Sequence, residues 1–141
     1  MFFLQPVVLL LALIGPLGFQ TVYRGTQSQI EEPREVTIRS MADWRALWNE
    51  HAPAAPVPVV DFKREMVVGV FLGTRPTGGY AVEITSLDAT RNELTVSYRV
   101  DAPARDAMVV QALTAPAHLV RFASRKGSVK FVRAAAVKPA K

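Results

Sequence analysis

Short stretches in which apolar and polar residues alternate recur along most of the chain. This two-residue period is typical of strands that bury one face, and it predicts strands at residues 21–24, 35–39, 80–85 and 93–100. Residues 88–92 carry turn-forming residues, so the last two of these strands should form a hairpin. Residues 25–33 are polar and should form a turn or hairpin loop between the first two.

Turn residues mark out further strands in the second half of the chain. Thr114-Ala115-Pro116 separates residues 109–113 from residues 118–123, and Lys126-Gly127 precedes residues 128–133. Each of these three stretches is a predicted strand. Residues 66–73 are almost continuously apolar, as expected of a central strand that is covered on both faces.

One segment has the spacing of a helix rather than of a strand. Ser40 can cap the amide of Asp43, and the apolar stripe that follows repeats at three and four residues. This stripe should pack on a sheet. Residues 52–58 contain three prolines, which cannot continue a helix, so the helix should end near residue 51. The stripe consists of Trp44, Leu47, Trp48 and His51.

These elements predict a mainly β protein, an antiparallel β-sandwich or open barrel with one α-helix at about residues 41–51. The chain has 141 residues, which is room for a single domain. We expect that domain to cover residues 20–134, with a disordered basic tail at residues 135–141.

A hydrophobic leader precedes the predicted domain. Residues 1–19 carry no charge, and the run from Pro6 to Phe19 is close in length to the apolar region of a signal peptide. No lysine or arginine precedes the run, so an uncleaved N-terminal membrane anchor and a buried N-terminal segment stay open as alternatives. The leader predicts an exported protein of the periplasm, cell envelope or extracellular space.

Composition and charge remove several classes of function. The chain has no cysteine, so it has no disulfide, thiolate metal site, cysteine nucleophile or lipid-modified cysteine. The net charge is +5, and all seven charged residues after Ala107 are basic. This basic segment is either a solvated edge or a surface for weak electrostatic association. Its residues are not interleaved with aromatic ones, so we expect no nucleic-acid partner.

We looked for catalytic chemistry and found no arrangement that supports it. No serine has the setting of a nucleophile, and His51, His118 and Asp61 match no spacing of metal ligands. Gly78-Gly79 precedes a predicted strand, whereas phosphate-binding loops precede a helix. The sequence therefore predicts a protein that is not an enzyme and has no cofactor and no metal.

Residues 75–80 form the most distinctive loop, between the most apolar strand and the next one. Proline restricts its backbone, and two glycines permit either unusual backbone angles or the close approach of another chain. Two readings stay open: a contact loop that binds a partner, and a tight connection whose glycines serve only its own geometry.

The same loop belongs to a longer pattern. Residues 60–73 end in Phe71-Leu72-Gly73, and residues 75–84 contain Pro76-Thr77-Gly78-Gly79-Tyr80. In this pattern the chain resembles the C-terminal domain of the protease complex subunit PrcB family. Further matches lie at residues 111–114, 116 and 129–131, so the resemblance covers about residues 60–131.

The resemblance implies an exported, non-catalytic accessory protein that binds and stabilises a partner. The namesake of the family supports the assembly or stability of a surface serine-protease complex, so the implied partner is an exported serine-protease complex of the envelope. The hydrophobic leader adds the option of membrane association. The residues expected to bind the partner are Arg75, Pro76, Thr77, Gly78, Gly79, Tyr80, Thr114 and Pro116.

Two alternative functions remain. The loop is also similar, more weakly, to the active-site loop of chagasin-type cysteine-peptidase inhibitors, which implies a peptidase inhibitor. This chain departs from those inhibitors, because Arg75 and Gly78 stand where they have asparagine and threonine. The other alternative is a structural envelope protein that associates through its basic segment.

Overall fold

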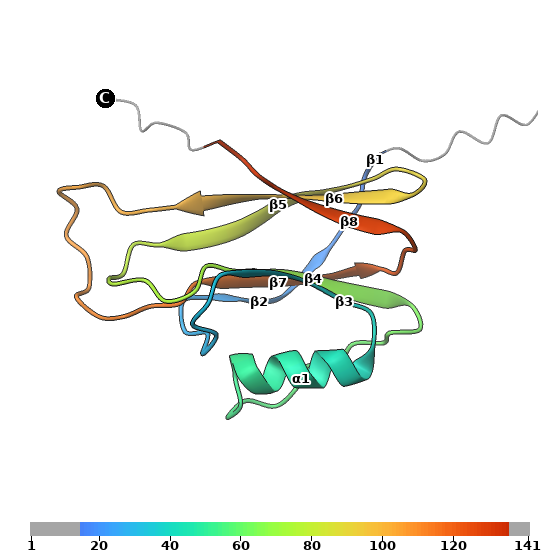
Figure 1. Ribbon diagram of the computed structural model, residues 1–141, viewed down its shortest axis with the longest axis horizontal. Helices are drawn as coiled ribbons and strands as arrows, with labels where there is room; N and C mark the ends of the chain where they lie inside the picture. The colour runs from blue at the N-terminus through green and yellow to red at the C-terminus, as the bar shows by residue number, and fades with distance from the viewer. Residues whose placement is uncertain (1–14, 136–141) are drawn as a thin grey trace, which may run out of the picture.

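The computed structural model describes residues 15–135, which form two four-stranded sheets packed face to face with one helix on the outside (Figure 1). One sheet has the strand order β1-β5-β6-β8 and the other β2-β7-β4-β3. The fold is therefore mainly β, as the sequence predicts, and it is a sandwich. Within the described residues the elements are β1 (Gly15–Pro16), β2 (Gln20–Gly25), β3 (Arg34–Ile38), α1 (Met41–His51), β4 (Glu65–Phe71), β5 (Ala81–Ala89), β6 (Glu93–Asp101), β7 (Ala117–Ala123) and β8 (Ser128–Arg133).

Strand β4 is central, as its continuous apolar sequence predicts. It pairs with β3 on one side and with β7 on the other. Its alternate side chains enter two different cores: Met66 and Val68 pack between the sheets, and Val67 and Phe71 pack with the helix side chains. A strand with this environment must be apolar on both faces, and β4 is buried from Met66 onward.

Helix α1 forms where the capping residue and the apolar stripe predict it. The Ser40 hydroxyl oxygen accepts a hydrogen bond from the Asp43 amide at 3.2 Å, and all four residues of the stripe are buried. The indole of Trp44 donates to the carbonyl of Pro58 at 2.9 Å, and that of Trp48 donates to Ala55 at 3.1 Å. The tryptophans therefore hold the proline-rich connector as well as the core.

Two details of the strand predictions are wrong. Residues 109–113 are not a strand but part of the irregular connection between β6 and β7. Residues 25–33 do not close a hairpin, because β2 and β3 lie at opposite edges of one sheet with β7 and β4 between them. The predicted hairpin of β5 and β6 is confirmed. One pair departs from the antiparallel expectation, since β8 runs parallel to β6.

Residues 15–19, which the sequence assigns to the leader, contact the domain. Gly15 and Pro16 pair with Ala89 and Asp88 at the end of β5, and Leu17 and Phe19 pack against the core between the sheets. The β domain therefore includes residues 15–19, ahead of its predicted start at residue 20. The predicted leader before Gly15 and the predicted tail from residue 136 lie outside the described residues. Within residues 15–135 no helix is long and apolar enough to cross a membrane.

Candidate functional site

Three connections gather at one end of the sandwich, which we call the loop end. They are residues 26–33 between β2 and β3, residues 72–80 between β4 and β5, and residues 102–116 between β6 and β7. The topology places them together, because the end of β2 pairs with the start of β7 and the start of β3 pairs with the end of β4. Figure 1 shows the three connections at the left of the molecule.

Backbone hydrogen bonds join the first connection to the other two. The Thr74 amide donates to the Glu31 carbonyl at 2.9 Å, and the Ala115 amide donates to the Thr26 carbonyl at 2.8 Å. The Ser28 amide donates in turn to the carbonyl of Ala115 at 3.1 Å. Paired backbone groups hold irregular segments in one conformation, so the loop end is an ordered surface.

The loop at residues 75–80 is bonded to the same long connection. Arg75 and Thr114 exchange two backbone hydrogen bonds, of 2.7 and 3.0 Å. The Thr114 hydroxyl donates to the carbonyl of Thr77 at 2.8 Å, and the Gly78 amide donates to the carbonyl of Val110 at 2.9 Å. The structure therefore brings Thr114 beside the loop, as the sequence analysis grouped them.

The two glycines of the loop have different environments. Gly79 has a φ of +89°, and a Cβ atom there would lie 2.8 Å from the Cβ of Pro103. A side chain at Gly78 would meet only Val110, at ordinary van der Waals distances. Gly79 is therefore required by the geometry of the connection, whereas Gly78 is not.

The remaining predicted site residues differ in how far they reach solvent. Pro76 is exposed and Tyr80 is half-buried. The guanidinium carbon of Arg75 lies 5.7 Å from the centre of the Tyr80 ring, so the face of this ring packs against the arginine. Pro116 is buried, and its carbonyl accepts a hydrogen bond from the Leu72 amide at 2.9 Å. Pro116 therefore supports the loop end from inside the fold and is not part of its surface.

The sequence analysis missed the apolar surface of the long connection. Met108 is fully exposed, Val110 is 71% exposed and Leu113 is 72% exposed. The turn residues that follow predict a strand at residues 109–113, and a strand there would bury part of this set. The signal that could have revealed the surface is the preceding Ala102-Pro103-Ala104, which breaks strand pairing before the apolar residues.

A cavity of about 280 Å³ opens at the loop end between the edges of the two sheets. Glu35 on β3 and Tyr98 on β6 face each other across it, and the tyrosine hydroxyl donates to the Glu35 carboxylate at 2.8 Å. Burial of the ring, together with the hydrogen bond and the charge of Glu35, raises the pKa of Tyr98 to about 12. Three arginines also line the cavity: Arg34, Arg75 and Arg133.

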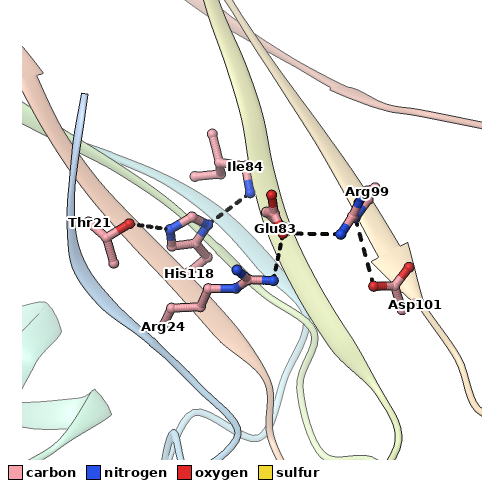
Figure 2. A network of polar contacts seen from close by, with 7 residues as sticks. All are labelled: Thr21, Arg24, Glu83, Ile84, Arg99, Asp101 and His118. Atoms are coloured by element: carbon pink, nitrogen blue, oxygen red, sulfur yellow. Dashed lines mark hydrogen bonds and ion pairs between the residues drawn. The ribbon is translucent and has the colours of Figure 1, made fainter. Parts of the chain in front are cut away.

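His118 bonds to both sheets. Its Nδ1 atom accepts a hydrogen bond from the Ile84 amide on β5 at 2.8 Å, and its Nε2 atom lies 2.9 Å from the Thr21 hydroxyl on β2. Figure 2 shows these two contacts on opposite sides of the ring. Burial, and to a smaller extent the charge of Arg24, lower the pKa of His118 to about 4. The neutral ring is therefore a structural link between the sheets.

A chain of ion pairs runs beside this link. Arg24 on β2 contacts Glu83 on β5 at 2.6 Å, and Glu83 contacts Arg99 on β6 at 3.2 Å. Arg99 also lies 3.8 Å from Asp101 (Figure 2). Most of these side chains reach solvent, where such pairs contribute about 0–1 kcal/mol each. Sequence reasoning missed this network because its members come from three different strands.

His51 and His118 do not form a common site. The His51 ring packs edge-on against Tyr23 and Phe71 in the core beneath α1, whereas His118 lies between the sheets. Burial lowers the pKa of His51. Among residues 15–135, no three histidine, aspartate or glutamate side chains are grouped as a metal site would need.

Part of the basic segment is committed to contacts within the fold. Arg121 donates to the Gln20 side chain at 2.7 Å and lies 3.8 Å from the Glu65 carboxylate. Arg125 donates to the carbonyl of Thr90 at 3.1 Å. These two arginines hold neighbouring strands and turns together.

The comparisons with known proteins give one match. No curated protein and no solved structure matches this chain. One family model does match, and it covers residues 66–123, from the start of the central strand to the end of β7. That stretch contains the loop at residues 75–80 and the whole connection that is bonded to it. Residues 66–123 therefore match the PrcB C-terminal family.

Proposed function

We propose that this chain is an exported, non-catalytic accessory protein that binds and stabilises a protein partner through its loop end. The observation that carries the proposal is the exposed apolar set Met108, Val110 and Leu113 on a connection that hydrogen bonds hold in place. Exposed apolar side chains gathered on one surface are typical of protein-binding sites. Ordered loops also lose little conformational entropy when they dock.

The family supports the choice of partner. The matched stretch includes two of the three connections of the loop end, residues 72–80 and 102–116, and PrcB proteins take their name from a protease complex. We therefore propose an exported protease complex of the envelope as the partner. The predicted leader supports export, and the polar interior contacts of both histidines support a structural rather than catalytic role.

The test compares two double variants of the full chain in its own organism. Met108→Ser with Leu113→Ser removes apolar area from the loop end. Val57→Ser with Val59→Ser removes exposed apolar area from the proline-rich connector, and serves as the matched control. Tagged proteins are cross-linked in cells, and the captured protease is quantified in the envelope fraction.

We expect the wild type and the connector variant to capture the same protease, and the loop-end variant to lose at least 90% of it, since a few residues near the centre of an interface carry most of its binding energy. All variants should unfold at similar temperatures, because every replaced side chain is exposed. Equal capture by both double variants would refute the loop end as the interface. Capture that disappears for both variants as salt rises would favour association through the basic segment.

A further inference from the structure

The cavity at the loop end contains a positive charge that the fold does not neutralise. The Nε atom of Arg75 is buried and has no hydrogen-bond partner among the described residues. No carboxylate of residues 15–135 forms an ion pair with its guanidinium. A buried N–H group without a hydrogen-bond partner is costly, and such an unpaired group in a native fold requires an explanation.

The other charges of the cavity wall leave an excess of positive charge. Arg34 is neutralised by Glu50, whose carboxylate lies 2.7 Å away. Arg133 has no ion-pair partner among the described residues, and Glu35 has only the hydroxyl of Tyr98. Two unpaired arginines thus face one carboxylate, so the wall still attracts an anion.

The geometry points to a carboxylate as that anion. A guanidinium is planar and presents its N–H groups as a fork that matches a carboxylate. The rest of the wall includes the apolar side chains of Val70 on β4, of Leu72 just after it and of Val100 on β6. A volume of about 280 Å³ suits one side chain rather than a large ligand.

The hydrogen bonds of the nearby backbone amides indicate whether this carboxylate belongs to a chain end or to a side chain. Sites for a C-terminal carboxylate usually surround it with free backbone N–H groups. Here the amides of Leu72, Thr74 and Arg75 already donate to Pro116, Glu31 and Thr114. With these three amides occupied, the side chains of the cavity wall are the main donors to an anion, which favours the acidic side chain of an incoming protein.

We propose that the cavity lined by Arg75 and Arg133 binds an aspartate or glutamate side chain of the partner protein, next to the exposed apolar residues of the loop end. This inference rests on the proposed function, since it names the chemistry that the same surface recognises. Arg75 is the main ligand of the carboxylate, and Tyr80 supports the guanidinium from behind. Glu35 limits the affinity because it repels the incoming charge.

Binding of short peptides to the full chain tests the proposal without the partner. The probe is an acetylated, amidated hexapeptide of alternating leucine and glutamate. Two controls are the same peptide with glutamine in place of glutamate, and the glutamine peptide with a free C-terminal carboxylate. Calorimetric titrations are made with the wild type and with Arg75→Gln, Arg133→Gln, Glu35→Gln and Arg45→Gln. Arg45 is an exposed residue of α1 outside this cavity, so its variant removes the same charge elsewhere.

We expect the glutamate peptide to bind and both glutamine peptides to bind at least tenfold more weakly. Arg75→Gln should weaken binding by roughly tenfold or more, as for the loss of a charge-assisted hydrogen bond, and Arg133→Gln by a smaller factor. Glu35→Gln should strengthen binding several-fold, and Arg45→Gln should change it less than twofold. Without peptide, Arg75→Gln should unfold at the same or a higher temperature, because it removes an unpaired charge.

Four results would overturn the proposal. Binding of the peptide with the free C-terminus alone would show that the site takes a chain end. Equal weakening by Arg75→Gln and Arg45→Gln, or full competition by inorganic phosphate, would show attraction to net charge only. If no peptide binds while the Met108 and Leu113 variant still loses partner capture, the proposed role of the cavity is rejected and the proposed function stands. Peptide binding that depends on Arg75, with capture unchanged by that double variant, would reject the proposed interface instead.

Discussion

At the scale of single residues, the loop at residues 75–80 contains both a glycine that the backbone requires and residues that reach solvent. Gly79 is needed by the backbone, because its φ is positive and Pro103 fills the space where a Cβ would lie. Pro76, by contrast, is exposed. The interpretation of this loop as a tight connection therefore applies to Gly79, whereas the contact loop stays a proposal for the residues that reach solvent.

The neighbouring glycines provide a matched pair of substitutions. Gly79→Ala should lower the free energy of unfolding by about 2 kcal/mol, because a side chain is strained at positive φ and also meets Pro103. Gly78→Ala should change it by less than about 0.5 kcal/mol. Denaturant unfolding measures both. Similar losses for the two variants would show that the assignment of the backbone role to Gly79 is wrong.

At the scale of elements, prediction from the sequence succeeded where the signal is local. The stripe from Trp44 to His51 and the cap at Ser40 lie within a dozen residues of each other, and helix α1 forms as they indicate. The central position of β4 also follows from its own residues. By contrast, residues 109–113 have the composition of a strand, but their neighbour is the loop at residues 75–80, which offers single hydrogen bonds instead of a ladder. Which segments meet is not encoded locally, so the arginine-lined cavity could not be foreseen, and the exposed apolar set had only the break at residues 102–104 as a signal.

The cap of α1 gives a prediction at this scale. Ser40→Ala removes the acceptor of the Asp43 amide and should lower the free energy of unfolding by about 1 kcal/mol. Ser40→Asp keeps an acceptor at the same position and should be close to the wild type. Chemical denaturation followed by tryptophan fluorescence reports on α1 directly, since both tryptophans lie on it. A stable alanine variant would mean that packing alone fixes the start of the helix.

At the scale of the whole molecule, the two sheets are joined by polar contacts as well as by their apolar core. His118 belongs to β7 but accepts a hydrogen bond from β5 of the other sheet. Protonation of Nδ1 would remove that acceptor and place a charge among buried apolar residues. The nearby charges act in opposite directions, since Arg24 lowers the pKa of His118 and Glu83 raises it. Burial is the larger cause.

Stability should therefore fall as the solution becomes mildly acidic. The pKa of His118 is about 4 in the folded protein and about 6.5 in the unfolded chain, so the unfolded state binds more protons between these values. The neutral His118 ring makes its full contribution to stability above about pH 6.5, and this contribution is lost as pH falls to about 4. It amounts to on the order of 3 kcal/mol. The lowered pKa of His51 acts in the same direction.

Unfolding of the wild type and of His118→Gln between pH 4 and pH 7.5 measures this dependence. The variant should be less stable than the wild type at pH 7.5 and should lose much less stability on acidification. The slope that remains in the variant is assigned to His51 and to ordinary carboxylates. If both proteins show the same slope, His118 does not link the sheets through its neutral form.

The pairing of β1 fixes the end of the sandwich at which Gly15 lies. Gly15 and Pro16 lie beside Ala89 and Asp88, next to the turn between β5 and β6, whereas the loop end begins at the other extremity of those strands (Figure 1). A group attached at Gly15 is therefore at the end of the sandwich opposite the loop end, where the proposed interface lies. When the protein is immobilised or fused at that end, the loop end faces outward, so a dye, bead or neighbouring domain attached there leaves the proposed interface accessible.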